Sequence, residues 1–192
     1  MKVGLFGGSF NPVHFGHVGL AKWVIEHTDL DELWLLVSPN NPLKPADMLT
    51  PEEQRLEAVR KAVKDIPHVV ASDFEFALPR PSYTADTLRA LQTAFPLYDF
   101  TLVIGEDNWT LFDRWREHDY ILANYRIFVY PRHPKTTNTF DKSYISNTPN
   151  SPITPNNPII PNVPITPKGV FYLAEAPLFD ISSTQIRNNL KQ

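Results

Sequence analysis

The sequence contains no cysteine, which excludes disulfide bonds, thiolate metal sites and cysteine nucleophiles. It also lacks any apolar run close to the roughly 20 residues that a membrane-spanning helix needs. Basic residues are not in excess, because 18 lysines and arginines against 21 acidic residues give a net charge of −3. This balance argues against a general nucleic-acid-binding protein. The first residues show neither the apolar segment nor the cleavage site of a signal peptide, so we expect a cytoplasmic protein without membrane contact.

A chain of 192 residues can form one domain with a sizeable core. Hydrophobic residues make up 42% of the chain and charged residues 20%, which is typical of a globular protein and excludes general disorder. We therefore predict a single domain over residues 1–192.

Proline is concentrated in one segment. Nine of the 19 prolines lie from Pro131 to Pro167, and seven of these recur at every third position from Pro149 onward. Period-three proline favours the polyproline II conformation, which forms no internal hydrogen bonds. We predict that residues 133–167 form a proline-rich surface loop inserted in the domain, with docking to a partner protein or a neighbouring subunit as the alternative.

Short apolar runs alternate with helical patterns along the chain. Runs typical of buried strands lie at residues 2–6, 33–37, 68–71, 100–104 and 126–130, with a further short candidate at residues 170–173. The alternation predicts an α/β fold, a Rossmann-like doubly wound parallel sheet of about five strands with helices on both faces. The loops that follow the strands should then gather at the edge formed by the carboxyl ends, where such sheets bind ligands.

The most informative segment is GGSFNPVHFGH, residues 7–17, which follows the first predicted strand. Its glycines allow a turn with exposed backbone N–H groups. His17 lies near the start of a predicted helix, whose N-terminus attracts anions, and an imidazole there can reach a phosphate oxygen. The segment is neither a P-loop nor a dinucleotide fingerprint, since it lacks their glycine and lysine spacing. A zinc site on His14 and His17 is disfavoured because no third ligand is evident.

A second candidate anion site is ISSTQIR, residues 181–187. Three hydroxyl side chains stand at the predicted start of a helix, and Arg187 follows on the next turn. Hydroxyls also cap helices, so simple capping is the alternative interpretation. Taken with residues 7–17, this segment predicts one half of a clamp for a triphosphate.

Together the two segments resemble the HxGH nucleotidyltransferases, and among these the bacterial nicotinate-nucleotide adenylyltransferases. Four other segments are similar to that family: residues 41–44, 82–88, 104–116 and 171–180. The resemblance implies that the adenylyl group of ATP is transferred to nicotinate mononucleotide, giving nicotinate adenine dinucleotide and pyrophosphate in NAD biosynthesis. It also implies in-line attack without a covalent intermediate, and Mg²⁺ as a cofactor that accompanies ATP.

The resemblance further implies roles for residues at matching positions. The catalytic residues would be His14, His17, Lys44 and Arg187, all acting on the phosphates. The ATP-binding residues would be Gly8, Ser9, Phe10, His14, His17, Gly105, Asp107, Arg132, Ile181, Ser182, Ser183 and Arg187. The acceptor-binding residues would be Ser9, Lys44, Thr84, Trp115 and Arg116. The acceptor ring would stack on Trp115, and its carboxylate would be received by Thr84 and by backbone N–H groups near Arg116. No residue is predicted to ligate a metal.

Alternatives remain open at this stage. The acceptor could instead be nicotinamide mononucleotide or phosphopantetheine, although phosphopantetheine enzymes usually carry threonine at the position of His14. A non-catalytic nucleotide-binding module is a different class of protein, but it would have no need of groups directed at a transition state. A homo-oligomer is compatible with the sequence.

Overall fold

The computed structural model describes residues 1–39, 50–132, 169–179, 181 and 183–189. Its centre is a six-stranded sheet with the order β3-β2-β1-β4-β5-β6, in which every neighbouring pair is parallel. The strands are β1 (Lys2–Gly8), β2 (Glu32–Val37), β3 (Val69–Ser72), β4 (Asp99–Gly105), β5 (Arg126–Tyr130) and β6 (Val170–Tyr172). The predicted α/β class is confirmed, and the short candidate at residues 170–173 forms the sixth strand, at the edge of the sheet.

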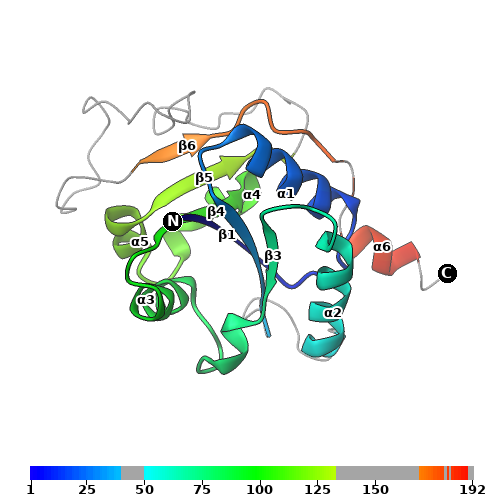
Figure 1. The fold of residues 1–192 in the computed structure, drawn as a ribbon, viewed down its shortest axis with the longest axis horizontal. Coiled ribbons are helices and arrows are strands. Elements are labelled where there is room, and N and C mark those ends of the chain that lie inside the picture. Colours follow the sequence, from blue (N-terminus) through cyan, green and yellow to red (C-terminus); the bar gives the residue numbers. More distant parts are fainter. Residues whose placement is uncertain (40–49, 133–168, 180, 182, 190–192) are drawn as a thin grey trace.

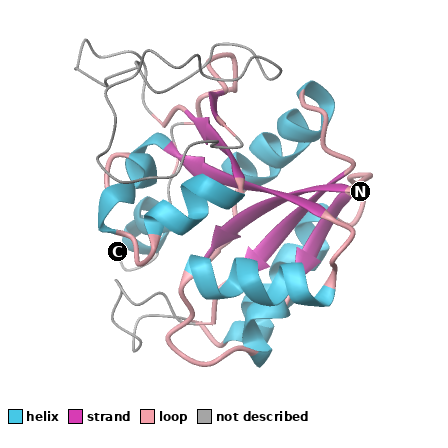
Figure 2. Ribbon diagram, turned by 90° about the vertical axis from the view of Figure 1, so that its left-hand side faces the viewer, coloured by secondary structure: helices cyan, strands magenta, loops and turns pink. Residues whose placement is uncertain are grey.

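Helices cover both faces of the sheet (Figures 1 and 2). The α-helices are α1 (Phe15–His27), α2 (Glu52–Val63), α3 (Thr84–Ala94), α4 (Glu106–Trp109), α5 (His118–Asn124) and α6 (Ser183–Asn189). The described residues also include two short 3₁₀ helices, η2 (Phe74–Ala77) and η3 (Phe112–Arg114). The apolar side chains of α1 and α2 pack in one core, and those of α3 and α5 pack in the other.

Successive residues of the central strands alternate between the two cores. In β1, Phe6 belongs to the core under α1 and α2, whereas Leu5 belongs to the core under α3 and α5. Leu35 and Leu36 of β2 divide in the same way. Because both faces are covered, these strands read as continuous apolar runs, which is why their positions were predictable.

Gly4 of β1 occupies a place with no room for a side chain. A Cβ atom there would lie 2.6 Å from Cδ1 of both Leu30 and Leu33, two buried core residues. We expect Gly4→Ala to lower the free energy of unfolding by about 1–3 kcal/mol through overpacking, measured by urea denaturation. Gly7→Ala is the matched control on the same strand, because a Cβ at Gly7 would meet no heavy atom within 4 Å. Equal stability of the two variants would contradict this account.

The parallel strands bring several loops to one edge of the sheet. The loops after β1, β2, β4 and β5 all follow carboxyl ends of adjacent strands, as expected from the sequence. The start of α6 also lies there, since the Ser183 hydroxyl donates to the Pro12 carbonyl oxygen at 2.9 Å. The predicted proline-rich loop, residues 133–167, is outside the described residues.

Candidate active site

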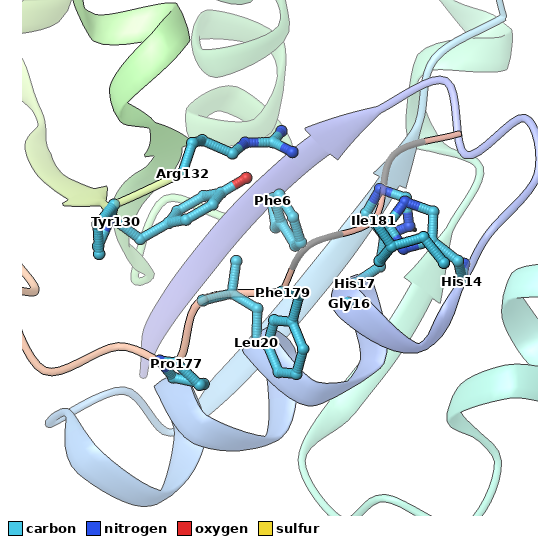
Figure 3. Close-up of a pocket in the computed structure, with 11 residues that line it drawn as sticks. Phe6, His14, Gly16, His17, Leu20, Tyr130, Arg132, Pro177, Phe179 and Ile181 are labelled. Atoms are coloured by element: carbon cyan, nitrogen blue, oxygen red, sulfur yellow. Dashed lines mark hydrogen bonds between the residues drawn. The ribbon is translucent and has the colours of Figure 1, made fainter. Parts of the chain in front are cut away.

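The turn after β1 leads directly into α1 and places two histidines on its first turn. His14 is the N-cap residue with an extended backbone, and α1 begins at Phe15. The His14 backbone N–H donates to His17 Nδ1 at 3.2 Å, and the two rings stack with centroids 3.7 Å apart. Figure 3 shows both rings beside Ile181 at the start of the helix. The sequence prediction of paired histidines at a helix N-terminus therefore matches the observed positions.

The His14 ring is neutral at neutral pH. Burial and, to a smaller extent, the positive charge of Arg132 lower the pKa of His14 to about 4. A neutral imidazole can still donate one hydrogen bond, so His14 can bind a phosphate without first gaining a proton.

This lowered pKa predicts a pH dependence of stability. The unfolded chain takes up a proton at His14 below its ordinary pKa of 6.5, whereas the native state does so only near pH 4. The unfolded state therefore binds more protons in this window, and the free energy of unfolding falls as the pH falls from 6.5 towards 4. We expect His14→Gln to weaken this dependence, measured as the midpoint of thermal unfolding across that range. An NMR titration of His14 with a midpoint at or above 6.5 would contradict it.

Phe10 packs against His17. Its side chain is buried, and its ring centroid lies 4.9 Å from that of His17 and 5.8 Å from that of Phe6. The Phe10 backbone has a φ of 43°, a strained conformation for a bulky residue. A Cβ at Gly8, the last residue of β1, would lie 3.1 Å from the Phe10 ring, which is closer than Cβ contacts usually are. The side chain of Phe10 is thus a packing group, which leaves the backbone for any contact with ATP.

The two predicted halves of the triphosphate clamp are in direct contact. The Arg187 guanidinium donates to the Asn11 carbonyl oxygen, next to the contact between Ser183 and Pro12. Ile181 lines a small pocket together with both histidines, Phe179 and Arg132 (Figure 3). Pro12 and Ser183 are 171 positions apart in the sequence, and the fold brings their segments into contact at this place. Ser182 and Lys44, which belong to the predicted site, lie outside the described residues.

Three other predicted ATP-binding residues, Gly105, Asp107 and Arg132, also lie together at this edge of the sheet. Arg132, which follows β5, lies with Nε 3.2 Å from Oδ1 of Asp107, which follows β4. A Cβ at Gly105 would be 2.3 Å from that Asp107 oxygen and 2.7 Å from Arg132 Nε, so a larger residue there would displace this ion pair. Arg132 lines both the small pocket at the histidines and a larger one beside it.

The larger pocket has a volume of about 250 Å³ and is lined by three of the five predicted acceptor residues, whereas Ser9 is not part of its lining. Thr84, the first residue of α3, lines it, as do Trp115 and Arg116. Trp115 is partly buried and packs against Phe112, with ring centroids 5.2 Å apart. The pocket thus combines an aromatic surface with the N-terminus of an 11-residue helix, which favours a negative charge.

The Arg116 guanidinium already has partners within the protein. Its guanidinium stacks over the Tyr83 ring at 4.8 Å and lies 3.4 Å from a carboxylate oxygen of Asp86. It also lies 3.7 Å from Glu117. This fits the expectation that only the backbone near Arg116 would receive a ligand.

Glu75 lines the same pocket and was missed by the sequence analysis. It is buried, and its carboxylate accepts hydrogen bonds from the Thr87 hydroxyl at 2.9 Å and the Ser82 hydroxyl at 3.3 Å. These two residues flank the start of α3, so Glu75 fixes the backbone around Thr84. The signal in the sequence was a single acidic residue between Phe74 and Phe76, where a buried polar group needs a specific partner.

Within the described ranges, no group of three or more histidine, aspartate and glutamate side chains is placed to hold a metal ion. The helices in the same ranges include none that is long and apolar enough to cross a membrane.

Comparison with known proteins identifies the class to which this fold and site belong. The family model described as cytidylyltransferase-like matches residues 5–189, so the chain belongs to that family. A relative in Flavobacterium psychrophilum is 40% identical over 191 residues, covering 100% of this chain and 87% of the relative. Another relative, in Bacteroides fragilis, is 43% identical over 189 residues, covering 98% of this chain and 82% of that relative. Both are named probable nicotinate-nucleotide adenylyltransferase, and the chain belongs with these nucleotidyltransferases, which confirms the resemblance found in the sequence.

Solved structures support the same fold. A putative nicotinate-nucleotide adenylyltransferase from Vibrio parahaemolyticus has a TM-score of 0.55 and 27% identity, covering 67% of this chain and 76% of that one. The nicotinic acid mononucleotide adenylyltransferase of Plasmodium falciparum, complexed with NaAD, has a TM-score of 0.63. The match covers 71% of this chain and 67% of that one. Its identity of 18% makes that likeness evidence for the fold alone.

Proposed function

We propose that this chain transfers the adenylyl group of ATP to nicotinate mononucleotide, giving nicotinate adenine dinucleotide and pyrophosphate. One observation carries the proposal: the two-histidine turn and the start of α6 adjoin a 250 Å³ pocket that contains Trp115 and Thr84. A site for a triphosphate thus lies next to a site for an aromatic acid. The names of the relatives support the same reaction.

The reaction needs positioning and charge neutralisation more than covalent chemistry. A phosphate oxygen of the acceptor attacks the α-phosphorus of ATP, the bond from that phosphorus to the bridging oxygen breaks, and pyrophosphate leaves with the electron pair. In our proposal His17 donates to the α-phosphate oxygens, where charge accumulates, and His14 and Arg187 hold the β- and γ-phosphates. Lys44 would lie near the reacting phosphates, although its position is outside the described residues.

The remaining predicted residues bind the two substrates. Backbone groups of Gly8, Ser9 and Phe10, together with Ile181, Ser182 and Ser183, would surround the triphosphate. Gly105, Asp107 and Arg132 would contact the adenosine. The acceptor ring would stack on Trp115, and its carboxylate would be received by Thr84 and backbone N–H groups near Arg116. The α3 N-terminus would favour this acid over the neutral amide.

We treat Mg²⁺ as part of the MgATP substrate. When bound to phosphate oxygens, the ion offsets their charge, and Mg²⁺ is commonly held by substrate phosphates and water rather than by a protein cage. We assign it no protein ligand. The cytoplasmic location, a homo-oligomer and a protein partner for the proline-rich segment stay predictions from the sequence.

Product analysis tests the proposal. The protein is incubated with MgATP and nicotinate mononucleotide, and the products are separated and identified by mass. We expect nicotinate adenine dinucleotide and pyrophosphate in equal amounts. Release of phosphate or pyrophosphate without the dinucleotide would contradict adenylyl transfer to this acceptor.

A further inference from the structure

Arg55 is a buried charged residue with no role in the site described so far. It lies on the first turn of α2 and is only 3% exposed. Among the described residues, no carboxylate forms an ion pair with it. Burial of an arginine without an acidic partner is costly unless its N–H groups are hydrogen-bonded.

All four hydrogen bonds that the guanidinium forms with described residues go to backbone carbonyl oxygens. Nη1 donates to Ser9 at 2.6 Å and to Ser38 at 2.8 Å. Nη2 donates to Pro39 at 3.0 Å, and Nε donates to Thr50 at 2.8 Å. The planar guanidinium fork is the side chain best suited to join several carbonyl groups at once.

Three of these carbonyls lie at the edge of the sheet that carries the candidate active site. Ser9 follows β1 directly, and Ser38 and Pro39 follow β2, the strand paired with it. Buried carbonyl groups beyond the strand ends still need hydrogen-bond donors. Arg55 supplies such donors at the point where the phosphate-binding turn begins.

The turn is held by residues from two helices, α2 and α6, and by Thr50 just before α2. On the α2 side, Arg55 holds the Ser9 carbonyl, and the Thr50 N–H donates to the Asn11 side chain at 3.3 Å. On the α6 side, Ser183 and Arg187 donate to the carbonyl oxygens of Pro12 and Asn11. The strained Phe10 backbone therefore lies between the Ser9 carbonyl held by Arg55 and the Asn11 carbonyl held by Arg187.

We propose that Arg55 is a positioning residue for the adenylyl transfer: by holding the Ser9 carbonyl to the ends of β1 and β2, it keeps His14 and His17 aligned for the triphosphate. The catalytic part of this inference rests on the proposed function, whereas the ordering of the turn does not. Loss of the guanidinium releases the turn, and a displacement of about 1 Å at a reacting group can cost about 100-fold in rate.

The test is Arg55→Met, which keeps much of the side-chain volume but removes every donor. We expect faster amide hydrogen exchange in residues 9–13 and a fall in kcat/KM for ATP of about 10- to 100-fold, in a protein that is still folded. Arg60→Met is the control for charge, because Arg60 lies on the same helix but is exposed and pairs with Asp73. Gly4→Ala is the control for stability, since it should weaken the fold without touching the turn.

A positioning role also predicts rescue. In Arg55→Ala, added guanidinium at millimolar concentration should restore part of kcat/KM for ATP and slow exchange in residues 9–13, and it should not help Arg60→Ala. Wild-type exchange and kcat/KM in Arg55→Met would overturn the inference, and so would an equal loss of kcat/KM in Gly4→Ala. If neither variant folds, Arg55→Lys decides. Its ammonium cannot span all four carbonyls, so wild-type kinetics and exchange there would overturn the proposal.

The two proposals fail differently. The exchange measurement uses no substrate, so it reports on the turn whatever the wild-type reaction is. Absence of dinucleotide synthesis by the wild type would refute the proposed function, whereas an unchanged turn in the Arg55 variants would refute only this inference.

Discussion

Replacement of His17 by alanine is expected to lower kcat by about 100- to 1000-fold while the protein stays folded, the usual cost of removing one donor from a developing oxyanion. His17 lies on the first turn of α1, where its ring stacks on His14 and packs over Phe10. It is only partly buried, so its loss leaves no large cavity. The measurement is steady-state dinucleotide formation, with folding checked by circular dichroism.

His27→Ala is the matched control for this experiment. His27 lies on the last turn of the same helix, stacked on Trp23 and away from both pockets. Its removal should leave kcat unchanged. Near-normal turnover by His17→Ala would refute the role assigned to His17, and an equal loss in both variants would show that the effect comes from the helix itself.

Replacement of Trp115 by alanine is expected to raise KM for nicotinate mononucleotide by about 10- to 100-fold, as judged from the usual value of stacking on an aromatic side chain. Trp115 lines the larger pocket and is absent from the small pocket at the histidines. KM for ATP should therefore stay close to that of the wild type.

Trp115→Phe serves as its control, because a phenylalanine ring keeps a stacking surface and the contact with Phe112. It should retain most of the affinity for the acceptor. If Trp115→Ala changes both KM values equally, Trp115 is a packing residue of the core and not part of the acceptor site.

The sequence was sufficient to predict the central part of the fold, because both faces of the sheet are covered. The apolar run at residues 33–37 became β2 (Glu32–Val37), and the glycine-rich turn with its two histidines lies where the first strand ends. These features depend on local composition and on the rule that parallel strands share a carboxyl edge. The strand count was less well defined, since β6 has only three residues.

Arg55 and Glu75 could not be predicted in the same way. Arg55 binds a carbonyl 46 positions away, and Glu75 binds a hydroxyl 12 positions away. Such contacts between a side chain and a distant group have no periodicity, and their residue types are ordinary for exposed helices and turns. Their roles can be recognised only from the structure, which shows that these charged side chains are buried.

The central claim is adenylyl transfer to an acidic pyridine nucleotide, and pyrophosphate release with three acceptors tests it most directly. Nicotinate mononucleotide, nicotinamide mononucleotide and phosphopantetheine are compared side by side with MgATP. The account predicts rapid release with the acid, much slower release with the amide, since the α3 N-terminus and Thr84 favour a carboxylate, and none with phosphopantetheine. Preference for the amide would contradict the assignment of the carboxylate site, and release with phosphopantetheine alone, or with no acceptor, would contradict the proposed function itself.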